Sequence, residues 1–543
     1  MTDRREWLKR RIALALMGIV SGAHHALPAQ PVSFSSSNLP ILVIDTQGQR
    51  IRDNVRITAS LGIVDNAGKR NSLSDPFTDG SGEIAIETRG SATQSYPKGQ
   101  YRFETQDEAG ENRNVRLLGM PSENDWILYG PYDDQSLIRN NLAYGLSMDL
   151  GRYASRCRFC ELVLNGDYRG VYVLMEKIKR DRSRVDIAAM DWNDNAWDSL
   201  TGGYILKIDK WEGENMGGWR SSRNTAYQYH YPAADDITEA QKQYIRDWMD
   251  EFEGTLDGDS TGDLREGYEN RIDTDSFVDH FLLNEFCKNV DAYRISAFLY
   301  KDRDSSDPRL HAGPVWDFNL SFGKTWWIED RYQVEGWQID YGVTHPWDGY
   351  QVPFWWITLA RDGSFVRRVQ ARWNSLKHTL FSKDSLFSRI HSMTGLLGEA
   401  RTRNFERWPE TAAEHGYDEE IALLKQWISD RWDWIDVNIG SLSPENESSS
   451  PGDFSLGRSY PNPFNERVTI PFSLKKKAHF RLSVCSALGR EIRLLFGGDL
   501  SPGEHRFAWD GKDGGGKNTA SGVYWYRAEV AGRRSAGKML LLR

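Results

Sequence analysis

The chain has 543 residues, of which 39% are hydrophobic, 12% aromatic and 27% charged. This length predicts two or three domains, and the many aromatic residues exclude a disordered or collagen-like chain. The formal charge of −9 provides no basic field for tracking a nucleic acid, so we expect no nucleic-acid partner. Four cysteines in so long a chain exclude a scaffold built on disulfides.

The N-terminus has the pattern of a secretory signal peptide. Basic residues between Arg4 and Arg11 precede an apolar run from Ile12 to Ala23. This run is shorter than the roughly 20 residues that a membrane-spanning helix needs, and no later segment is long enough either. We therefore predict a signal peptide over residues 1–29 and an exported protein, secreted or at the cell surface, without a transmembrane segment.

The next segments predict a β-rich N-terminal region, because β-branched residues and two-residue alternation recur there. Strands are expected over Pro40–Asp45, Ile51–Ile63, Glu83–Thr88 and Gln100–Glu104. Asn165-Gly166 between the apolar segments Glu161–Leu164 and Gly170–Glu176 predicts a β-hairpin. From Asp235 the apolar period becomes helical, and the predicted helices are Gln241–Phe252, Phe277–Phe286, Phe365–Leu380, Leu386–Arg401 and Glu419–Ile439.

A separate C-terminal domain is predicted. Residues 441–454 are polar, contain Pro and Gly and lack apolar periodicity, which is typical of a linker. Short strands separated by turn residues follow over Val468–Leu474, Phe480–Ser486, Glu491–Phe496, Gly503–Trp509, Gly522–Val530 and Gly537–Leu542. The sequence therefore predicts an α+β region over residues 30–440 and a small all-β sandwich over residues 455–543.

Two aspartates flank one predicted hairpin within the α+β region. A predicted helix ends just before Asp291, and the strands Ile295–Lys301 and Leu310–Trp316 then lead into Asp317. Both side chains are expected on the same side of this hairpin. Phosphoryl transfer requires one carboxylate that orients the attacking hydroxyl and accepts its proton, and a second that holds a divalent cation. The alternative is structural: Asp291 caps a turn and Asp317 pairs with an arginine.

Several short motifs extend around and upstream of these aspartates. They are Arg89-Gly-Ser-Ala-Thr-Gln-Ser-Tyr-Pro-Lys98, Asp125-Trp-Ile-Leu, Ser136-Leu-Ile-Arg-Asn140, Leu164-Asn-Gly-Asp-Tyr-Arg-Gly-Val-Tyr172, Gly202-Gly-Tyr-Ile-Leu-Lys207, Asn289-Val-Asp291, Ser296-Ala-Phe-Leu-Tyr-Lys301 and Gly313-Pro-Val-Trp-Asp-Phe-Asn319. In this order they resemble the CotH family of secreted atypical protein kinases over roughly residues 38–440. The resemblance implies a kinase-like fold with a β-rich N-terminal lobe and a helical C-terminal lobe. It also implies ATP with Mg²⁺ or Mn²⁺ as cofactors and a protein as substrate.

The resemblance assigns roles to individual residues. Asp291 is the implied catalytic aspartate and Asp317 the implied metal ligand. The sequence departs from the pattern at two positions: Ser296 stands where a kinase catalytic loop carries Asn, and Asn319 stands where family members often have Asp. The second cation is therefore expected to bind less tightly, or through Asn289 and Asn319 together.

The nucleotide phosphates also need a cation, normally a strand lysine. Lys98 in the predicted N-lobe sheet is the first candidate, and Lys207, whose Tyr-Ile-Leu-Lys segment is similar to the lysine strand of ordinary kinases, is the alternative. Arg89, which begins the first motif, and Glu176, as a hinge residue or lysine partner, complete the nucleotide-binding candidates. For Glu176 the alternative is an exposed strand residue paired with a neighbouring lysine.

Cys157-Arg-Phe-Cys160 is an isolated pair of cysteines. The pair supplies at most two zinc ligands, and no matching pair of Cys or His lies nearby. A strained disulfide and two unpaired thiols are the alternatives, and we assign the pair no function.

The C-terminal region carries a second set of motifs, Tyr460-Pro-Asn-Pro-Phe-Asn465, Ala487-Leu-Gly489, Gly503-Glu-His505, Trp509-Asp-Gly-Lys-Asp513, Ala520-Ser-Gly-Val-Tyr524 and Lys538-Met539. They resemble the FlgD-like immunoglobulin-fold module found at the C-termini of bacterial secreted proteins. Several such modules are type IX secretion sorting signals, and similar ones are attachment domains. The resemblance therefore implies a partner in the secretion or cell-surface machinery.

Together these patterns predict an exported protein kinase that transfers the γ-phosphate of ATP to Ser or Thr of a protein. The alternative is a catalytically inactive structural or adhesion protein of the cell surface with a kinase-like fold. Metal-dependent phosphoester hydrolysis is less favoured, because the sequence places no His or third acidic ligand beside the two aspartates.

Overall fold

The computed structural model describes residues 32–78, 80–90, 92–211, 217–256, 267–325, 331–442, 454–457, 459–486, 491–530 and 533–543. The chain divides into two compact units, residues 1–443 and 444–543. The predicted signal peptide and most of the predicted linker lie outside the described residues.

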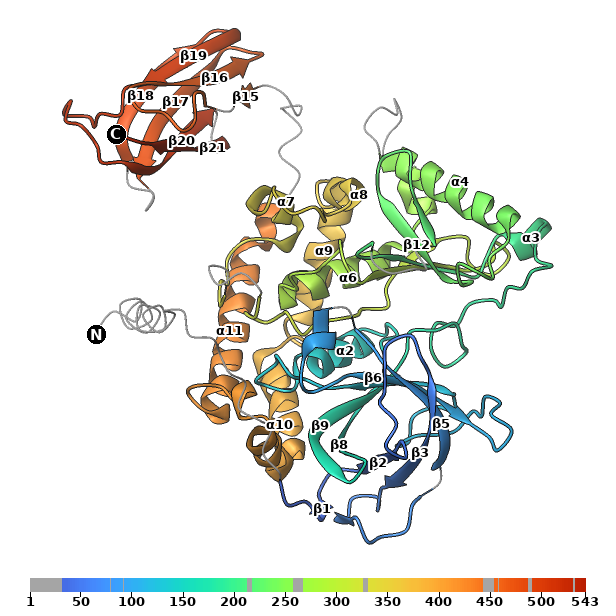
Figure 1. The fold of residues 1–543 in the computed structure, drawn as a ribbon. Coiled ribbons are helices and arrows are strands. Elements are labelled where there is room, and N and C mark those ends of the chain that lie inside the picture. Colours follow the sequence, from blue (N-terminus) through green and yellow to red (C-terminus); the bar gives the residue numbers. More distant parts are fainter. Residues whose placement is uncertain are drawn as a thin grey trace. The chain divides into compact units, whose positions relative to one another are not determined.

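A closed β-barrel forms the N-terminal part of the first unit (Figure 1). Its strands follow the order β2-β3-β5-β6-β7-β9-β8, and β2 pairs with β8 in parallel to close it. The strands of this region are β1 (Ser36–Ser37), β2 (Ile41–Asp45), β3 (Ile57–Val64), β4 (Asn71–Ser72), β5 (Gly82–Thr88), β6 (Tyr101–Gln106), β7 (Asp125–Tyr129), β8 (Cys157–Leu164) and β9 (Asp167–Glu176). Asn165 and Gly166 join β8 to β9 with φ of 53° and 79°, which confirms the predicted hairpin.

An antiparallel sheet of five strands and a set of helices form the rest of this unit. The sheet has the order β11-β12-β10-β13-β14. Its strands are β10 (Tyr204–Ile208), β11 (Gly218–Arg220), β12 (Ala226–Tyr231), β13 (Ala297–Lys301) and β14 (Leu310–Ala312). The helices are α2 (Arg139–Asp149), α3 (Trp197–Leu200), α4 (Glu239–Leu256), α6 (Thr274–Cys287), α7 (Tyr341–Thr344), α8 (Phe354–Leu359), α9 (Gly363–Leu376), α10 (Lys383–Arg407) and α11 (Tyr417–Asn438).

Helix α6 lies at the centre of the apolar core of this helical part. Asp273 caps its N-terminus by accepting a hydrogen bond from the N–H of Ser276 at 2.8 Å. Nearly every residue of α6 is buried, and the helix packs against α2, α9 and α11 (Figure 1). Helix α10 packs against barrel strand β9. The barrel and the helical part are therefore joined through β9 and α10.

Strand β14 is shorter than the predicted Leu310–Trp316, because Gly313 leaves the strand with φ of 116° and Pro314 has no N–H to donate. The predicted helices otherwise lie within or close to α4, α6, α9, α10 and α11, and the mixed α+β fold class is confirmed.

The second unit consists of two antiparallel sheets. One has the order β15-β16-β19 and the other β18-β17-β20-β21. The strands are β15 (Phe454–Leu456), β16 (Val468–Leu474), β17 (Ala478–Ser486), β18 (Glu491–Leu500), β19 (Gly503–Trp509), β20 (Gly522–Val530) and β21 (Arg533–Leu541). Their inward-facing side chains form a separate core that includes Val468, Phe480 and Trp509. The predicted all-β sandwich is confirmed.

Candidate active site

Two loops carry the predicted aspartates, and backbone hydrogen bonds hold them side by side. The first loop follows α6 and carries Asp291, and the second follows β14 and carries Asp317. The N–H of Val290 donates to the carbonyl of Leu320 at 3.1 Å, and the N–H of Phe322 donates to the carbonyl of Cys287 at 2.7 Å. These bonds place the two loops next to each other, as expected if both aspartates lie on one side of the hairpin.

Helix α2 fixes the segment around Asp317 from the other side. The N–H of Asp317 donates to the hydroxyl of Tyr144 at 2.9 Å, and the N–H of Phe318 donates to Oδ1 of Asn140 at 2.6 Å. Asn140 and Tyr144 are four residues apart on α2 and therefore share one helix face. Asp317 has φ of 59°, in the left-handed region that only a few residue types adopt readily. Such strained backbone is common in ligand-binding and catalytic segments.

The two carboxylates are electrostatically coupled. Burial, and next the charge of Asp291, raise the pKa of Asp317 to about 7, and the guanidinium of Arg89 opposes this shift. Burial also raises the pKa of Asp291, and Arg294 and Lys210 oppose it. A nearby divalent cation would relieve this repulsion, because it favours the charged form of both groups.

Two further acidic residues, Asp209 and Asp133, lie near enough to Asp317 to act on it electrostatically and were missed in the sequence. Their charges are among those that raise the pKa of Asp317. Asp209 follows β10, and its Oδ1 accepts a hydrogen bond from the N–H of Ser296 at 3.3 Å. Asp133 accepts one from the amide of Asn319 at 3.4 Å. Asp209 and Asp133 thus add negative charge near the pair, but within the described ranges they do not complete a group of side chains arranged to hold a metal ion.

The position of Asp209 near Asp291 could have been predicted from the sequence only if strands β10 and β13 had been paired first. Ile208 pairs with Ala297 in the β10–β13 ladder, which places the end of β10 beside the beginning of β13. Asp209 comes directly after Lys207-Ile208, so a prediction that paired these two strands would have brought it to the loop of Asp291.

The candidate cations occupy different places. The guanidinium of Arg89 lies over Trp316, 5.6 Å from its ring centre. Its positive charge opposes the rise in the pKa of Asp317. Lys98 is fully buried, donates to Oδ1 of Asn404 in α10 at 2.7 Å and lies 5.2 Å from the ring centre of Tyr172. Burial, and next the charge of Arg169, hold its pKa well below the usual range. The structure therefore places Arg89 where it acts electrostatically on Asp317 and packs Lys98 against α10.

Lys207 lies on β10 and forms an ion pair with Asp209 at 3.4 Å. The register of the β10–β13 ladder places Lys207 opposite Phe298, beyond the loop of Asp291. This alternative cation is thus connected to the cleft through Asp209.

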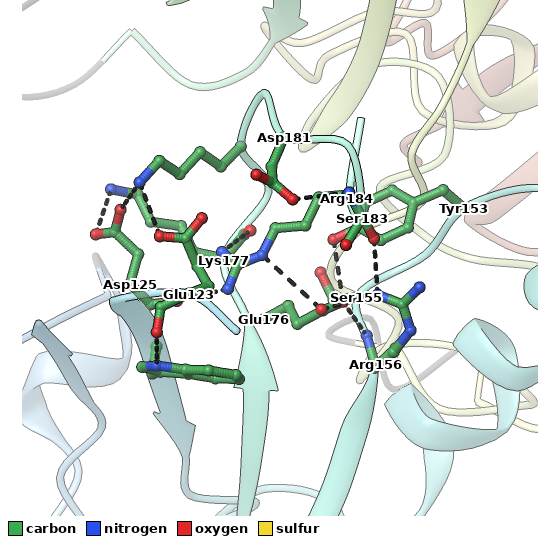
Figure 2. Close-up of polar contacts among 12 residues, drawn as sticks. Glu123, Asp125, Tyr153, Ser155, Arg156, Glu176, Lys177, Asp181, Ser183 and Arg184 are labelled. Atoms are coloured by element: carbon green, nitrogen blue, oxygen red, sulfur yellow. Dashed lines mark hydrogen bonds and ion pairs between the residues drawn. The ribbon is translucent and has the colours of Figure 1, made fainter. Parts of the chain in front are cut away.

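Glu176 lies at the end of β9 in a separate cluster of charged groups (Figure 2). Its side chain is completely buried and accepts hydrogen bonds from Arg156 at 2.8 Å and from the hydroxyl of Tyr153 at 3.2 Å. The lysines next to it, Lys177 and Lys179, pair with Asp125 instead. The alternative of an exposed strand residue paired with a neighbouring lysine is therefore wrong, and arginines are the partners of Glu176.

The remaining predicted residues have mainly local contacts. Oδ1 of Asn289 accepts a hydrogen bond from the N–H of Asp291 at 3.4 Å, and the amide of Asn319 is directed to Asp133. Ser296 contributes its N–H to Asp209. Asn289 is therefore engaged in shaping the loop, and Asn319 remains next to Asp317 at the cleft.

The donor set of the cleft fits a hard cation. Across the described ranges, no group of three or more His, Cys, Asp or Glu side chains is arranged to hold a metal ion by itself. Mg²⁺ in nucleotide sites is usually bound by one or two carboxylates together with waters and substrate phosphates. Asp317, with the amide oxygen of Asn319 beside it, provides such a partial set of oxygen ligands.

The two cysteines Cys157 and Cys160 are both free thiols. They are three residues apart on β8 and therefore point to opposite faces of the strand. Burial raises the pKa of both thiols, to about 12 for Cys160. Of the two alternatives, the unpaired thiols are confirmed.

The chain belongs to the CotH kinase protein family, whose model matches residues 86–435. The FlgD Ig-like domain matches residues 464–533. No curated protein matches the chain. None of the described helices is long and apolar enough to cross a membrane.

Similarity to solved structures is limited to parts of the chain. Dimeric latent PorU of Porphyromonas gingivalis is 18% identical with a TM-score of 0.16, over 18% of this chain and 10% of PorU. PorZ, described as a surface component of the type-IX secretion system of the same organism, is 22% identical with a TM-score of 0.13, over 16% of this chain and 12% of PorZ. The DNA glycosylase AlkC of Pseudomonas fluorescens is 14% identical with a TM-score of 0.14, over 36% of this chain and 56% of AlkC. Scores this low carry no argument about fold or function.

Proposed function

We propose that this protein is an exported CotH-type protein kinase that transfers the γ-phosphate of ATP to Ser or Thr of a protein. The observation that carries the proposal is the coupled pair Asp291 and Asp317 on adjoining loops, with the pKa of Asp317 raised to about 7 and Arg89 opposing that shift. Membership of the CotH kinase family supports the same chemistry.

Asp291 is the group that we assign to the acceptor hydroxyl. Its carboxylate is held by Nη2 of Arg294 at 3.3 Å, and Arg294 is itself fixed by Asp348 at 3.2 Å and by the ring of Tyr341 at 3.9 Å. A carboxylate in this position orients the hydroxyl and accepts its proton as the new bond to phosphorus forms. Arg294 is a positioning residue in this proposal, because it touches Asp291 and not the substrates.

Asp317 and Asn319 are the residues that would hold Mg²⁺ or Mn²⁺. Bound there, the cation would neutralise charge on the phosphates. Ionised Asp317 accepts no hydrogen bond from any described side chain or backbone group, so its oxygens are available to a ligand. The nearby negative charges of Asp133 and Asp209 favour a cation further.

Arg89 is our first choice for the group that binds the phosphates, with Lys207 as the second. The positive charge of Arg89 opposes the rise in the pKa of Asp317. A guanidinium can also form paired hydrogen bonds with phosphate oxygens. Lys98 and Glu176 support the site from a distance in this proposal: Lys98 ties the barrel to α10, and Glu176 ties the end of β9 to Arg156.

We also propose that the C-terminal unit delivers or attaches the kinase, so that the protein acts outside the cell or at its surface. The match to the FlgD Ig-like domain and the signal-like N-terminal sequence support export. Secretion or cell-surface machinery is then a partner. The alternative function is a catalytically inactive surface protein on the same fold.

Nucleotide-induced thermal stabilisation separates the two functions. Millimolar ATP with Mg²⁺ or Mn²⁺ should raise the melting temperature of the wild type, because the nucleotide binds only the folded state. The Asp317→Asn variant serves as the matched control and should show no such rise. If neither cation produces a shift in the wild type, the kinase proposal fails and the inactive surface protein is favoured.

A further inference from the structure

A polar hollow of about 380 Å³ is formed by segments of the barrel, and Arg89, which acts electrostatically on Asp317, is one of its lining residues. The loop between β2 and β3 and the segment between β5 and β6 form its walls. Backbone hydrogen bonds fix these segments: the N–H of Thr88 donates to the carbonyl of Arg52, and the N–H of Arg89 to that of Gln100, both at 3.0 Å. The hollow is therefore built on barrel backbone.

Three arginines, Arg50, Arg52 and Arg89, line this hollow. In the described part of the chain, no carboxylate forms an ion pair with the guanidinium of Arg50 or Arg52. The acidic lining residue, Asp53, instead accepts a hydrogen bond from the side chain of Asn54 at 3.1 Å. Within a chain of net charge −9, the hollow therefore has three arginines and one aspartate in its lining, a local excess of positive charge.

Gln100 adds a polar side chain to the lining. It is 6% exposed and lines the hollow, and its amide N–H is a donor that an anion in the hollow can accept. The hydroxyls of Thr88 and Thr93 add further donors to the same walls.

The lining also indicates which kind of anion fits. Ile51 is the single apolar side chain among the lining residues, so these walls offer no slot for a nucleotide base. Arg50 and Arg52 are exposed at the rim, where an extended chain can reach them. Arg89 links the hollow to the candidate active site. It lies over Trp316, and its charge opposes the rise in the pKa of Asp317.

We propose that this hollow binds an acidic side chain of the protein acceptor, a carboxylate or a phosphoserine, beside the hydroxyl that receives the phosphate. The inference rests on the proposed kinase function for the role of the bound peptide, but the binding itself does not depend on catalysis. Arg50 and Arg52 contact the acidic side chain, and Arg89 lies between it and the phosphates. Residues 50–53 precede the segment matched by the CotH model, so this preference belongs to the present chain.

Fluorescence polarisation of labelled peptides with the full chain and no nucleotide tests the binding. The probes are a serine peptide flanked by glutamates, the same peptide flanked by phosphoserine, and an alanine-flanked peptide. The double variant Arg50→Glu/Arg52→Glu should weaken binding of both acidic peptides by about tenfold or more, since two charged hydrogen-bonding partners are reversed. The variant Lys69→Glu/Arg116→Glu changes the net charge equally at exposed positions outside the hollow, and it should bind like the wild type.

Three outcomes would overturn the inference: equal binding of all three peptides, equal losses in the two double variants, or a loss of ATP-induced stabilisation in Arg50→Glu/Arg52→Glu as large as its loss of peptide affinity. The last result would assign the arginines to the nucleotide. Failure of the proposed function is seen separately, because it removes ATP-induced stabilisation from the wild type while peptide binding persists.

Discussion

Asp317 and Glu176 are two buried carboxylates of the same unit in opposite electrostatic situations. Glu176 accepts hydrogen bonds from Arg156 at 2.8 Å and Tyr153 at 3.2 Å, and Arg184 lies 3.8 Å away (Figure 2). Burial and the charges of Asp291, Asp133 and Asp209 raise the pKa of Asp317 to about 7, and among the described residues Arg89 is the cation named as opposing this shift. Arginines of the protein compensate the charge of Glu176, whereas the charge of Asp317 is available for a bound cation or substrate.

This difference separates a structural cluster from a candidate site. Buried charges that are fully paired hold segments together, and removal of one partner leaves the other uncompensated. Carboxylates with perturbed pKa values in a cleft are characteristic of functional sites, because a substrate or cation provides the missing compensation. The predictions below test whether the two carboxylates respond as this comparison requires.

Glu176→Ala should produce the largest loss of stability. It leaves the buried Arg184 and the partly exposed Arg156 without their shared carboxylate, so we expect the free energy of unfolding of the first unit to fall by about 3 kcal/mol, the lower end of the loss for a buried pair. Urea denaturation followed by tryptophan fluorescence measures this loss. Glu108→Ala, at an exposed position of the same barrel, is the control and should change little. A loss no larger than that of the control would show that the cluster in Figure 2 is not compensated as described.

Asp317→Asn should have the opposite effect on the metal-free protein. The folded-state pKa of Asp317 is raised from 3.8 to about 7, so the folded wild type binds the extra proton and loses stability as the pH rises through this range. The Asn variant avoids this loss and should be more stable at pH 8, by on the order of 1–3 kcal/mol. Below about pH 4 Asp317 is protonated in both the folded and the unfolded wild type, and the two proteins should be nearly equal there.

Melting temperatures in EDTA between pH 4 and pH 8 measure this gap, which should widen as the pH rises toward about 7. A gap that is the same at every pH would contradict the assigned pKa shift. The same proton competes with a divalent cation, so Mg²⁺-ATP affinity of the wild type should fall by about tenfold per pH unit below about 7.

Arg89→Met and Lys98→Met should differ in nucleotide affinity. Arg89 acts electrostatically on Asp317, so its loss should weaken Mg²⁺-ATP binding by about tenfold, a typical value for one charged hydrogen-bonding partner. Lys98 is buried against Asn404, and Met of similar length should leave nucleotide affinity within about twofold. Calorimetric titration measures both. If Lys98→Met lost more Mg²⁺-ATP affinity than Arg89→Met, Lys98 would be the residue that binds the phosphates.

Removal of residues 456–543 should have the smallest effect on the kinase unit. The second unit has its own apolar core, so the unfolding transition of the first unit should change by less than about 0.5 kcal/mol. Retention of the truncated protein inside the cell would support a sorting role for the removed unit. Normal export of the truncated protein would leave attachment or spacing as its role.

The sequence predicted the parts of this molecule that depend on local pattern. The β8–β9 hairpin follows from Asn165-Gly166, and α6 follows from its buried apolar spacing. Asp291 and Asp317 were found because each follows a predicted element directly. The strands β16, β19 and β20 have the predicted bounds, since turn residues end each of them.

The parts that were missed depend on contacts between distant segments. The partner of Lys98 is Asn404, 306 residues later in the chain, so the burial of this lysine had no local signal. The recruitment of Asp209 depends on the β10–β13 pairing, and the approach of Arg89 to Asp317 depends on the packing of the barrel beside the β14 loop. The sequence shows the charge of Lys98, Asp209 and Arg89, but it does not show which distant residues each of them contacts.

The most direct test of the central claim is phosphate transfer by purified wild type and Asp291→Ala, with radiolabelled ATP, Mg²⁺ or Mn²⁺ and a generic protein acceptor. Asp291 acts mainly as the transition state forms, so phosphate incorporation should fall by about 100-fold or more, while ATP-induced stabilisation is retained. Incorporation that is equal in the two proteins would show that Asp291 only shapes its loop, and the phosphoryl-transfer account of this cleft would be contradicted.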